Sequence, residues 1–473
     1  MTSVGLLSFT NDRLDEVIQK AKDFAFTQGL VEPIKGDVIN ESVVTHISFM
    51  LAPSPIPQHH FEKLKEAQLD FNKLMYLVSQ DYDFICSVLK SSVKYDEFTR
   101  NLLKIYHKVH QKETKDRGTL DIIRCDYMLD SNEQKFKQIE INTIAAGMAA
   151  GAALMPLLHR YTLRLAGKYK EANQVPDSTS LEGIATSLVR AWEVYGQPNA
   201  SVLLVTEPAD LARINHRHIE FSIHEINPRI PFMKMSLGDI GMRANLTDDQ
   251  QLRIDGCEIA VVYYRTGYKP EFYKTKVEWK GRLLAEQSCA IKCPSIGGHL
   301  AGTKTVQQAI SEPGVIEKYI DDPEAVVRIR NTFCRLYSLN PGPKGDHAAD
   351  LGIENPEMFV LKPNRESGGN NLFGKYIKEK LIELKDSPER ATLILMEKVE
   401  PVKINGYSVK PLEPVTLREM TYELGIYGTT ICNSNGIIHS RQIGHLFRTK
   451  PADENEASLM AGIAVNDSPL LVS

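Results

Sequence analysis

The stretch FVLKPNRESGGNNLFG (359–374) constrains the fold of this 473-residue chain more than any other segment. Its apolar run FVL favours a β-strand, and Pro363 ends regular pairing, so Lys362 projects from the end of that strand. The adjacent Gly368 and Gly369 let backbone N–H groups approach an anion without a Cβ in the way. The order differs from that of a P-loop, in which the lysine follows the glycines. By itself the stretch fits either a phosphate-binding turn or an ordinary surface hairpin.

Three oxygen-bearing side chains indicate a cation near that turn. Glu366, beside a bound phosphate, would be repelled unless a cation lay between them. In the predicted strand KFKQIEINT (135–143), Glu140 and Asn142 are two residues apart and therefore share a face. Carboxylate and amide oxygens are ligands that Mg²⁺ accepts together with phosphates. These residues predict a magnesium site, and the polar face of an edge strand is the alternative for Glu140 and Asn142.

The apolar stretch LILMEKV (393–399) is a candidate nucleotide hinge. Its backbone groups could hydrogen-bond an adenine while Met396 packs on the ring. A methionine in an apolar strand more commonly belongs to a core, so both interpretations stay open at this point.

Strand and helix patterns alternate along the chain, which predicts an α/β fold. EIAVVYYR (258–265) is a continuous apolar run typical of a buried parallel strand, and SVLLVT (201–206) is a second strand candidate. Near the N-terminus, apolar residues recur at helical spacing over 14–25 and 61–75, which predicts a mainly helical region. A further helix is predicted from Pro313 to Leu339.

Composition excludes several classes of protein. The formal net charge is -4 and the pI about 6.4, so no extended surface for nucleic acid or an anionic membrane is expected. The cysteines form no CxxC pair, which favours reduced thiols over disulfides or a structural zinc site. The longest low-polarity run, IAAGMAAGAALMPLL (144–158), is too short to span a bilayer and predicts a buried helix. The N-terminus lacks a signal-peptide pattern, so a cytoplasmic location is expected unless a leader has been removed.

Taken together, the motifs resemble the eukaryotic-type glutathione synthetases, a family within the ATP-grasp ligases. The resemblance extends along the whole chain, and its most specific part is KPNRESGGNN with EINT upstream. It is carried by IRCDYM (123–128), KQIEINTI (137–144), EIAVVYYRTGY (258–268), KCPSIGGHLAGTK (292–304), FVLKPNRESGGNNLFG (359–374), ILMEKVEP (394–401), ELGIYG (423–428) and GHLFRTK (444–450).

The resemblance implies an α/β ATP-grasp fold with an inserted parallel-sheet substrate domain and a helical N-terminal region. The implied segments are a mainly helical region 1–110, a first core part 111–200 with the metal-binding strand, a substrate domain 201–302 and a second core part 303–473. The last segment would carry a glycine-rich lid at about 362–374 and an acceptor loop at about 451–462.

The implied activity is ATP-dependent joining of γ-glutamylcysteine to glycine through an acyl phosphate, which gives glutathione, ADP and phosphate. ATP would be a co-substrate, two magnesium ions would bind each subunit, and the protein would be a homodimer whose ligands are small molecules. Arg124 and Arg448 would be the catalytic carboxylate clamps, because a guanidinium binds a carboxylate bidentately.

The family's ligand contacts transfer to this sequence position by position. The implied metal ligands are Glu140, Asn142 and Glu366. The implied nucleotide-binding residues are Met128, Glu140, Lys304, Lys362, Gly368, Gly369, Asn371, Met396, Glu397, Lys398, Val399, Glu423 and Lys450. The implied substrate-binding residues are Arg124, Ala145, Gly147, Ala212, His216, Arg265, Tyr268, Arg448, Leu459 and Met460.

The substrate half departs from the family pattern, while the nucleotide half matches it. The family usually has Ser-Ala-Ser after EINTI, and two of its donor contacts are Asn and Gln. The residues that differ here are Ala145, Gly147, Ala212 and His216, together with Ser458, Leu459 and Met460 in the acceptor loop. Four lost neutral hydrogen bonds would remove about 2–6 kcal/mol of binding free energy. If the missing hydroxyls limit activity, restoring serine at 145 and 147 should raise it.

These departures leave two alternatives to glutathione synthesis. The first is a divergent ligase of the same family that uses another donor or amine acceptor. The second is a non-catalytic nucleotide-binding effector that keeps the fold.

Overall fold

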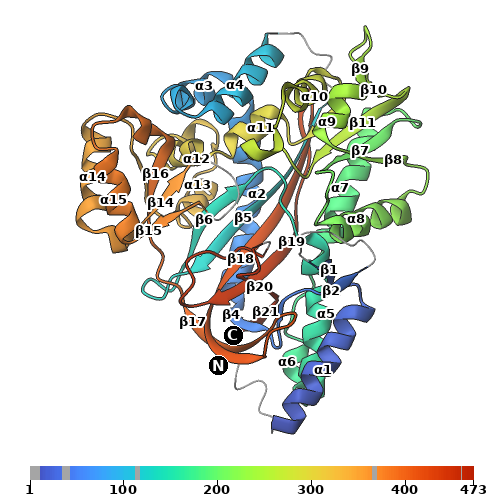
Figure 1. The fold of residues 1–473 in the computed structure, drawn as a ribbon, viewed down its shortest axis with the longest axis vertical. Helices are drawn as coiled ribbons and strands as arrows, with labels where there is room; N and C mark the ends of the chain where they lie inside the picture. Colours follow the sequence, from blue (N-terminus) through green and yellow to red (C-terminus); the bar gives the residue numbers. More distant parts are fainter. Residues whose placement is uncertain (1–10, 35–42, 112–117, 365–369, 460) are drawn as a thin grey trace.

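The computed structural model describes residues 11–34, 43–111, 118–364, 370–459 and 461–473 (Figure 1). Within these residues thirteen strands form one large mixed sheet. The strands are β3 (Phe49–Met50), β5 (Thr119–Leu129), β6 (Phe136–Asn142), β7 (Ser201–Val205), β8 (Phe232–Met235), β9 (Ala244–Leu246), β10 (Leu252–Ile254), β11 (Cys257–Tyr264), β12 (Ile291–Cys293), β17 (Lys403–Val409), β18 (Thr416–Asn433), β19 (Gly436–Pro451) and β20 (Val465–Asp467).

The order of the large sheet joins segments that are far apart in the sequence. β5 lies between β18 and β12, and it also pairs with β6. β11 is parallel to both β7 and β12, whereas β18 is antiparallel to β5 and β19. The predictions of a strand at 201–206 and of a buried parallel strand at 258–265 are therefore confirmed.

The two faces of β5 lead to different cores. Ile123, Cys125 and Tyr127 pack in the cluster that includes α2 (Gln58–Gln80). Leu120 and Ile122 pack in the cluster that includes α7 (Ser180–Tyr195). Because side chains alternate along a strand, Arg124 and Asp126 continue the second face, where the site described below lies.

A smaller antiparallel sheet lies to one side of the large one, in orange on the left of Figure 1. It consists of β13 (Leu336–Ser338), β14 (Phe359–Pro363), β15 (Leu372–Phe373) and β16 (Leu393–Glu397). Its apolar side chains share a cluster with residues of α14 (Pro343–Glu354) and α15 (Lys375–Glu383). The predicted strand FVL is thus β14, which pairs with β16 as far as Pro363.

The prediction of one helix from Pro313 to Leu339 is wrong. A 3₁₀ turn at Ile316–Lys318 precedes α13 (Pro323–Arg330), and Leu336–Ser338 is the strand β13. Asp322 caps α13 and Pro323 occupies its first turn, where the missing N–H costs nothing. The helical pattern therefore ends where backbone pairing with β16 begins.

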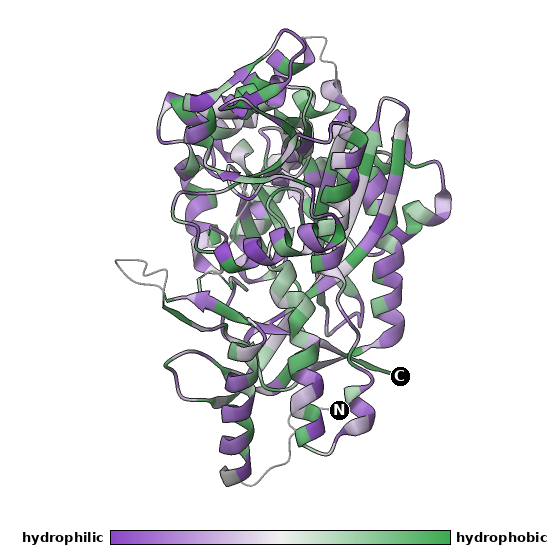
Figure 2. Cartoon of the chain, turned by 90° about the vertical axis from the view of Figure 1, so that its right-hand side faces the viewer, coloured by the Kyte–Doolittle hydropathy of each residue, from purple (hydrophilic) through white to green (hydrophobic). Residues whose placement is uncertain are grey.

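The N-terminal region is mainly helical, as predicted. Its helices are α1 (Asn11–Thr27), α2, α3 (Tyr82–Leu89) and α4 (Glu97–His110), joined by the short strands β1 (Val31–Pro33), β2 (Val44–His46) and β4 (Ser54–Pro57); β4 pairs with β21 (Pro469–Val472). In Figure 2 the outer helices alternate between hydrophilic and hydrophobic residues along their length, as helices that bury one face do.

The remaining helices flank the large sheet. They are α5 (Ala149–Leu165), α6 (Tyr169–Ala172), α8 (Arg213–Ile226), α9 (Leu237–Arg243), α10 (Lys276–Gln287), α11 (Ile296–Ala301) and α12 (Lys304–Ser311). Within the low-polarity run at 144–158, Ala149–Leu158 forms the largely buried start of α5, as expected, whereas residues 144–148 precede the helix. Among the described helices, none has the length and apolar character needed to cross a bilayer. All seven cysteines are described and carry free thiols.

Candidate active site

One cavity of about 760 Å³ collects most of the predicted site residues. Its walls come from β5 and β6, the small sheet, α8, the β18–β19 pair and the loop that follows β19. The predicted residues that line it are Arg124, Met128, Glu140, Asn142, Ala145, Gly147, Ala212, His216, Arg265, Tyr268, Lys362, Asn371, Met396, Lys398, Val399, Glu423, Arg448, Lys450, Ser458 and Leu459.

Arg124 and Arg448, which both line the cavity, meet at the shared, buried carboxylate of Asp126. Arg124 donates from Nε to Asp126 Oδ1 at 2.6 Å and from Nη2 to Oδ2 at 2.8 Å. Arg448 donates from Nη2 to the same Oδ2 at 3.1 Å and from Nε to Glu423 at 2.9 Å. Burial alone would lower the pKa of Arg448, but Glu423 and Asp126 outweigh it, so the pKa stays above its ordinary value. Both guanidinium groups therefore remain cationic and fixed.

A glycine makes this close packing possible. Gly425 lies opposite Asp126 across the β5–β18 pair. A Cβ on Gly425 would lie 2.6 Å from Asp126 Oδ1 and 2.7 Å from Arg124 Cδ. Any larger residue would displace the Arg124–Asp126 pair, which explains the glycine within the motif ELGIYG.

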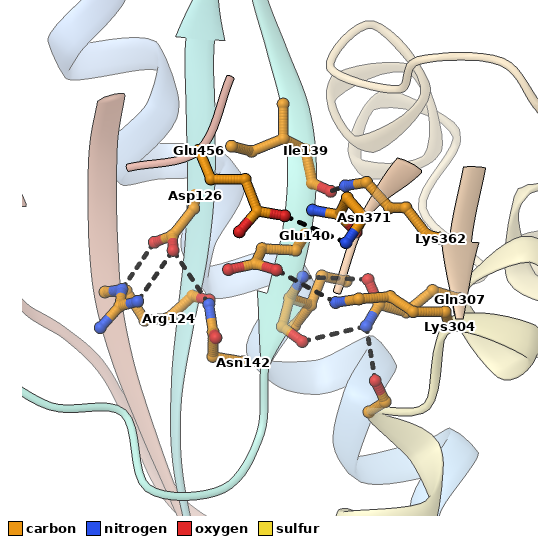
Figure 3. A network of polar contacts seen from close by, with 12 residues as sticks. Arg124, Asp126, Ile139, Glu140, Asn142, Lys304, Gln307, Lys362, Asn371 and Glu456 are labelled. Carbon is orange, nitrogen blue, oxygen red and sulfur yellow. Dashed lines mark hydrogen bonds and ion pairs between the residues drawn. The ribbon is translucent and has the colours of Figure 1, made fainter. Parts of the chain in front are cut away.

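Two lysines surround Glu140 at the other side of β6 (Figure 3). Lys304 donates to the Glu140 carboxylate at 3.2 Å, and Lys362 donates to the carbonyl of Ile139 at 2.7 Å. Burial raises the pKa of Glu140, but Lys304 and Lys362 pull it in the opposite direction, and the net pKa is well below its usual range. Burial, followed by the repulsion from Lys304, lowers the pKa of Lys362 to about 8. Two lysine side chains face one carboxylate here, so the region has an excess of positive charge that favours the binding of an anion.

The oxygen atoms of this region fit a hard cation such as Mg²⁺. The Asn142 amide donates both to Asp126 Oδ2, at 3.0 Å, and to the carbonyl of Arg124, at 3.3 Å. Its Oδ1 is therefore the atom left to act as a ligand, next to the ionised Glu140 on the same strand. The third predicted ligand, Glu366, lies outside the described residues, and among those described no group of three His, Cys, Asp or Glu side chains forms a metal site.

The apolar end of the cavity lies between the two sheets. Met128 of β5, Met396 of β16 and Val399 form a cluster with Cys334. Glu397 is turned away from this space, because its carboxylate accepts a hydrogen bond from Tyr337 at 3.2 Å and pairs with Arg335 at 3.5 Å. A flat apolar ring could lie against the methionines, but the Glu397 side chain does not face it.

A hydrogen bond joins the described end of the predicted lid to the predicted acceptor loop. The backbone N–H of Asn371 donates to Glu456 at 3.1 Å. Lys450 donates to the carbonyl of Asn455 at 2.6 Å, which ties the acceptor loop to the end of β19. The predicted lid glycines Gly368 and Gly369, and Met460 of the acceptor loop, lie outside the described residues.

The donor end shows what occupies the positions where the family pattern has hydroxyls. Ala145 and Met148 have positive φ values of 52° and 73°, so the chain turns sharply between β6 and α5. The carbonyl of Gly147 accepts hydrogen bonds from Arg124, at 3.3 Å, and from the Tyr427 hydroxyl. This turn therefore presents its backbone, rather than side chains, to the cationic groups.

Sequence reasoning missed two carboxylates that organise the cavity. Asp126 joins both arginines, and its signal was its spacing of two residues from Arg124 within IRCDYM. Asp210 lines the donor end and binds His216, and only its position just before an amphipathic helix pointed to it.

Comparisons with known proteins agree with one another. The family model described as "Eukaryotic glutathione synthase, ATP binding domain" matches residues 11–471. The glutathione synthetase of Xenopus laevis is 40% identical over 463 residues, 97% of this chain and 97% of that protein. The glutathione synthetase of Homo sapiens is 38% identical over 472 residues, 99% of each.

A solved structure shares the fold at lower identity. It is the apo form of a glutathione synthetase-like effector from Globodera pallida, with a TM-score of 0.79 and 24% identity over 98% of both chains. At that identity the likeness concerns the fold alone.

Proposed function

This chain belongs to the family of eukaryotic glutathione synthetases, and we propose that its cavity joins γ-glutamylcysteine to glycine with the conversion of ATP to ADP and phosphate. The observation that carries the proposal is 40% identity over 97% of the chain to a curated glutathione synthetase, combined with a cavity in which cations exceed acids. The protein is an enzyme of the ligase class.

We propose that the first step occurs beside Lys304 and Lys362. A carboxylate oxygen of the dipeptide attacks the γ-phosphorus of ATP, the bond to the β-phosphate oxygen breaks, and an acyl phosphate forms. Lys362, which lines the cavity, and Lys304, which is hydrogen-bonded to Glu140, would stabilise the charge of the transferring group, and Lys450 lines the same cavity. The apolar cluster of Met128, Met396 and Val399 would hold the adenine.

Magnesium is proposed as the metal that accompanies ATP. Glu140 and Asn142 would hold it with Glu366, and the metal would neutralise phosphate charge. Two ions per subunit is the number that the family resemblance implies. The ionised state of Glu140 suits this role, because a metal ligand must be deprotonated.

The second step joins the amine. The glycine nitrogen attacks the acyl carbon, phosphate leaves with the electron pair of the broken C–O bond, and the departing phosphate takes up the proton that the amine loses. Arg448 and Arg124 flank the centre of the cavity and would hold the carboxylates of the two substrates. The acceptor loop, joined to the lid through Glu456 and Asn371, would limit the access of water to the acyl phosphate.

The two alternatives raised by the sequence are not favoured. Relatives that match over at least 97% of the chain include glutathione synthetases at 34–40% identity. The effector-like structure is a relative in fold only, at 24% identity. The homodimer stays a proposal from the family resemblance, and sedimentation of the purified chain at several concentrations would test it.

A product assay tests the function directly. The purified full chain, given ATP, Mg²⁺, γ-glutamylcysteine and glycine, should release ADP and form a species with the mass of glutathione. Omission of either the dipeptide or glycine should abolish that mass. Release of ADP only with another dipeptide or amine would replace the proposal by the divergent ligase, and ATP binding without turnover of any pair would replace it by the effector.

A further inference from the structure

A line of four side chains ends at the donor side of the cavity. Lys234 of β8 pairs with Asp210 Oδ2 at 2.8 Å, and the same oxygen lies 2.8 Å from His216 Nδ1. Arg265 donates from Nε to His216 Nε2 at 3.2 Å. Its Nη1 donates to the carbonyl of Ala146 at 2.8 Å. The guanidinium is therefore held on two sides, by an imidazole and by a backbone carbonyl.

These contacts fix the protonation state of His216. Arg265 has only N–H donors, so His216 Nε2 must accept with its lone pair. Asp210 can only accept, so His216 Nδ1 must carry the proton. Burial is the main cause that lowers the pKa of His216, and the charges of Arg265 and Lys234 add to it, whereas Asp210 opposes it. The neutral imidazole is the form that this arrangement selects.

Gly147 provides the space that Arg265 occupies. A Cβ on Gly147 would lie 2.9 Å from Arg265 Nη2. A contact that short cannot persist, so a side chain at 147 would require the Nη2 end of the flexible Arg265 side chain to shift from this position. The absence of a side chain at 147 and the presence of a histidine at 216 are thus parts of one arrangement around Arg265.

We propose that His216, held by Asp210, is a positioning residue that fixes Arg265 for a carboxylate at the amino-acid end of the donor, and that Gly147 is the residue that makes this position accessible. The proposal rests on the proposed function, since it names how that function recognises its donor. A fixed guanidinium binds a carboxylate bidentately, and its orientation loses little entropy on binding.

Substitutions at position 216 separate positioning from packing. His216→Ala should raise the KM for γ-glutamylcysteine about 10- to 100-fold, with the KM for ATP unchanged, because Arg265 loses the acceptor of a charge-assisted hydrogen bond. His216→Gln should stay within about threefold of the unsubstituted protein, because an amide oxygen can accept from Arg265 and an amide N–H can donate to Asp210. His218→Gln, the same change on another face of α8, is the matched control and should change neither KM.

The pH profile supplies a readout that a purely structural role would not alter. Below its pKa, which lies under the ordinary value of 6.5, His216 would carry a proton on Nε2 and could no longer accept from Arg265. The kcat/KM for the dipeptide should therefore fall on the acid side of that value. Both donor carboxylates are already ionised there, so the limb does not come from the substrate. The His216→Gln variant should lack this limb.

The outcomes distinguish this proposal from the proposed function. If the unsubstituted chain makes no glutathione, the function fails, whatever the variants do. If it makes glutathione but His216→Ala keeps the original dipeptide KM, the positioning role is wrong while the function stands. An acid limb that persists in His216→Gln would equally overturn it.

Discussion

The nucleotide end and the donor end of the cavity hold their cations in different ways. At the nucleotide end, Lys304 and Lys362 crowd around the single carboxylate of Glu140, and positive charge is in excess. At the donor end, Arg265 is supported by two neutral acceptors, an imidazole and a carbonyl, and its direction is fixed. One end thus supplies surplus charge and the other supplies orientation.

This difference follows from what each end is proposed to bind. A transferring phosphoryl group carries its charge over several oxygens, so the sum of nearby cations matters more than the direction of any one. A single carboxylate is recognised by two parallel N–H groups, so direction decides. Removal of a lysine charge at the nucleotide end should therefore have a large effect on the kinetics with ATP. Displacement of Arg265 at the donor end, with its charge kept, should have a moderate effect on the KM for the dipeptide.

The largest expected effect comes from Lys362→Met. Loss of this cation should lower kcat/KM for ATP by about 10²–10³-fold, as the loss of a preorganised electrostatic contact does. Stability should not fall with it. The lowered pKa of Lys362, about 8, means that folding disfavours the charged lysine at neutral pH, so its removal should hold or raise the Tm.

Lys292→Met is a suitable control, because Lys292 is also buried but lies on β12 and donates to the carbonyl of Ser288. It should leave the ATP kinetics unchanged. Steady-state ADP release and thermal denaturation measure both quantities. A Lys362→Met protein with ordinary ATP kinetics would remove the claim that surplus charge defines the nucleotide end.

The next largest effect is expected from Glu140→Gln. It removes the carboxylate that balances the two lysines and the proposed metal oxygen, so kcat should fall about 10²-fold. The Mg²⁺ concentration for half-maximal rate should rise as well. Glu133→Gln, which disrupts the pair of the half-exposed Glu133 with Lys137, is the control. An unchanged Mg²⁺ dependence in Glu140→Gln would contradict the metal assignment.

A smaller effect at the donor end is expected from Gly147→Ser. Restoring the family's serine should raise the dipeptide KM about tenfold, because its Cβ would lie 2.9 Å from Arg265 Nη2 and displace the guanidinium. Ala145→Ser adds a hydroxyl where a side chain already exists, so it should hold or lower that KM. Kinetics with varied γ-glutamylcysteine test both. A Gly147→Ser protein with tighter donor binding would show that the missing hydroxyl, and not Arg265, limits recognition.

The sequence predicted the elements of the nucleotide end well because its signals are local. Glu140 and Asn142 share a face through their spacing alone, and β14 follows from the apolar run before Pro363. The strand β13 was missed because only three residues form it and its partner β16 lies more than fifty residues away. No local pattern reports such pairing.

At the donor end the sequence predicted less of the site. The predicted loss of binding from the missing hydroxyls at 145 and 147 assumes that no other group occupies the space that they leave. The structure places Arg265 there, and that contact joins His216 to a residue 49 positions further along the chain. Asp126 was overlooked for a similar reason: its bond to Arg448 spans 322 positions and depends on the order of β5, β18 and β19.

The smallest expected effect distinguishes the two ends by the sign of their pH dependence. Lys362 is a cation below its pKa of about 8 and becomes neutral above it, so kcat/KM for ATP should decline as the pH rises through that value. In the complex the phosphates favour the charged lysine, so kcat itself should change less. Lys362→Arg keeps its charge throughout this range and should lack the decline.

Lys450→Arg controls for a second buried lysine that lines the cavity and whose pKa burial also lowers, and it should keep the decline. With dipeptide and glycine saturating, kcat/KM for ATP from pH 6 to 9 isolates the nucleotide end. The donor end should show the opposite limb, on the acid side, through His216. If the Lys362 variant alters only the alkaline decline and the His216 variant alters only the acid decline, the two ends of the cavity act independently. A single limb altered by both variants would mean that the two ends act as one electrostatic unit.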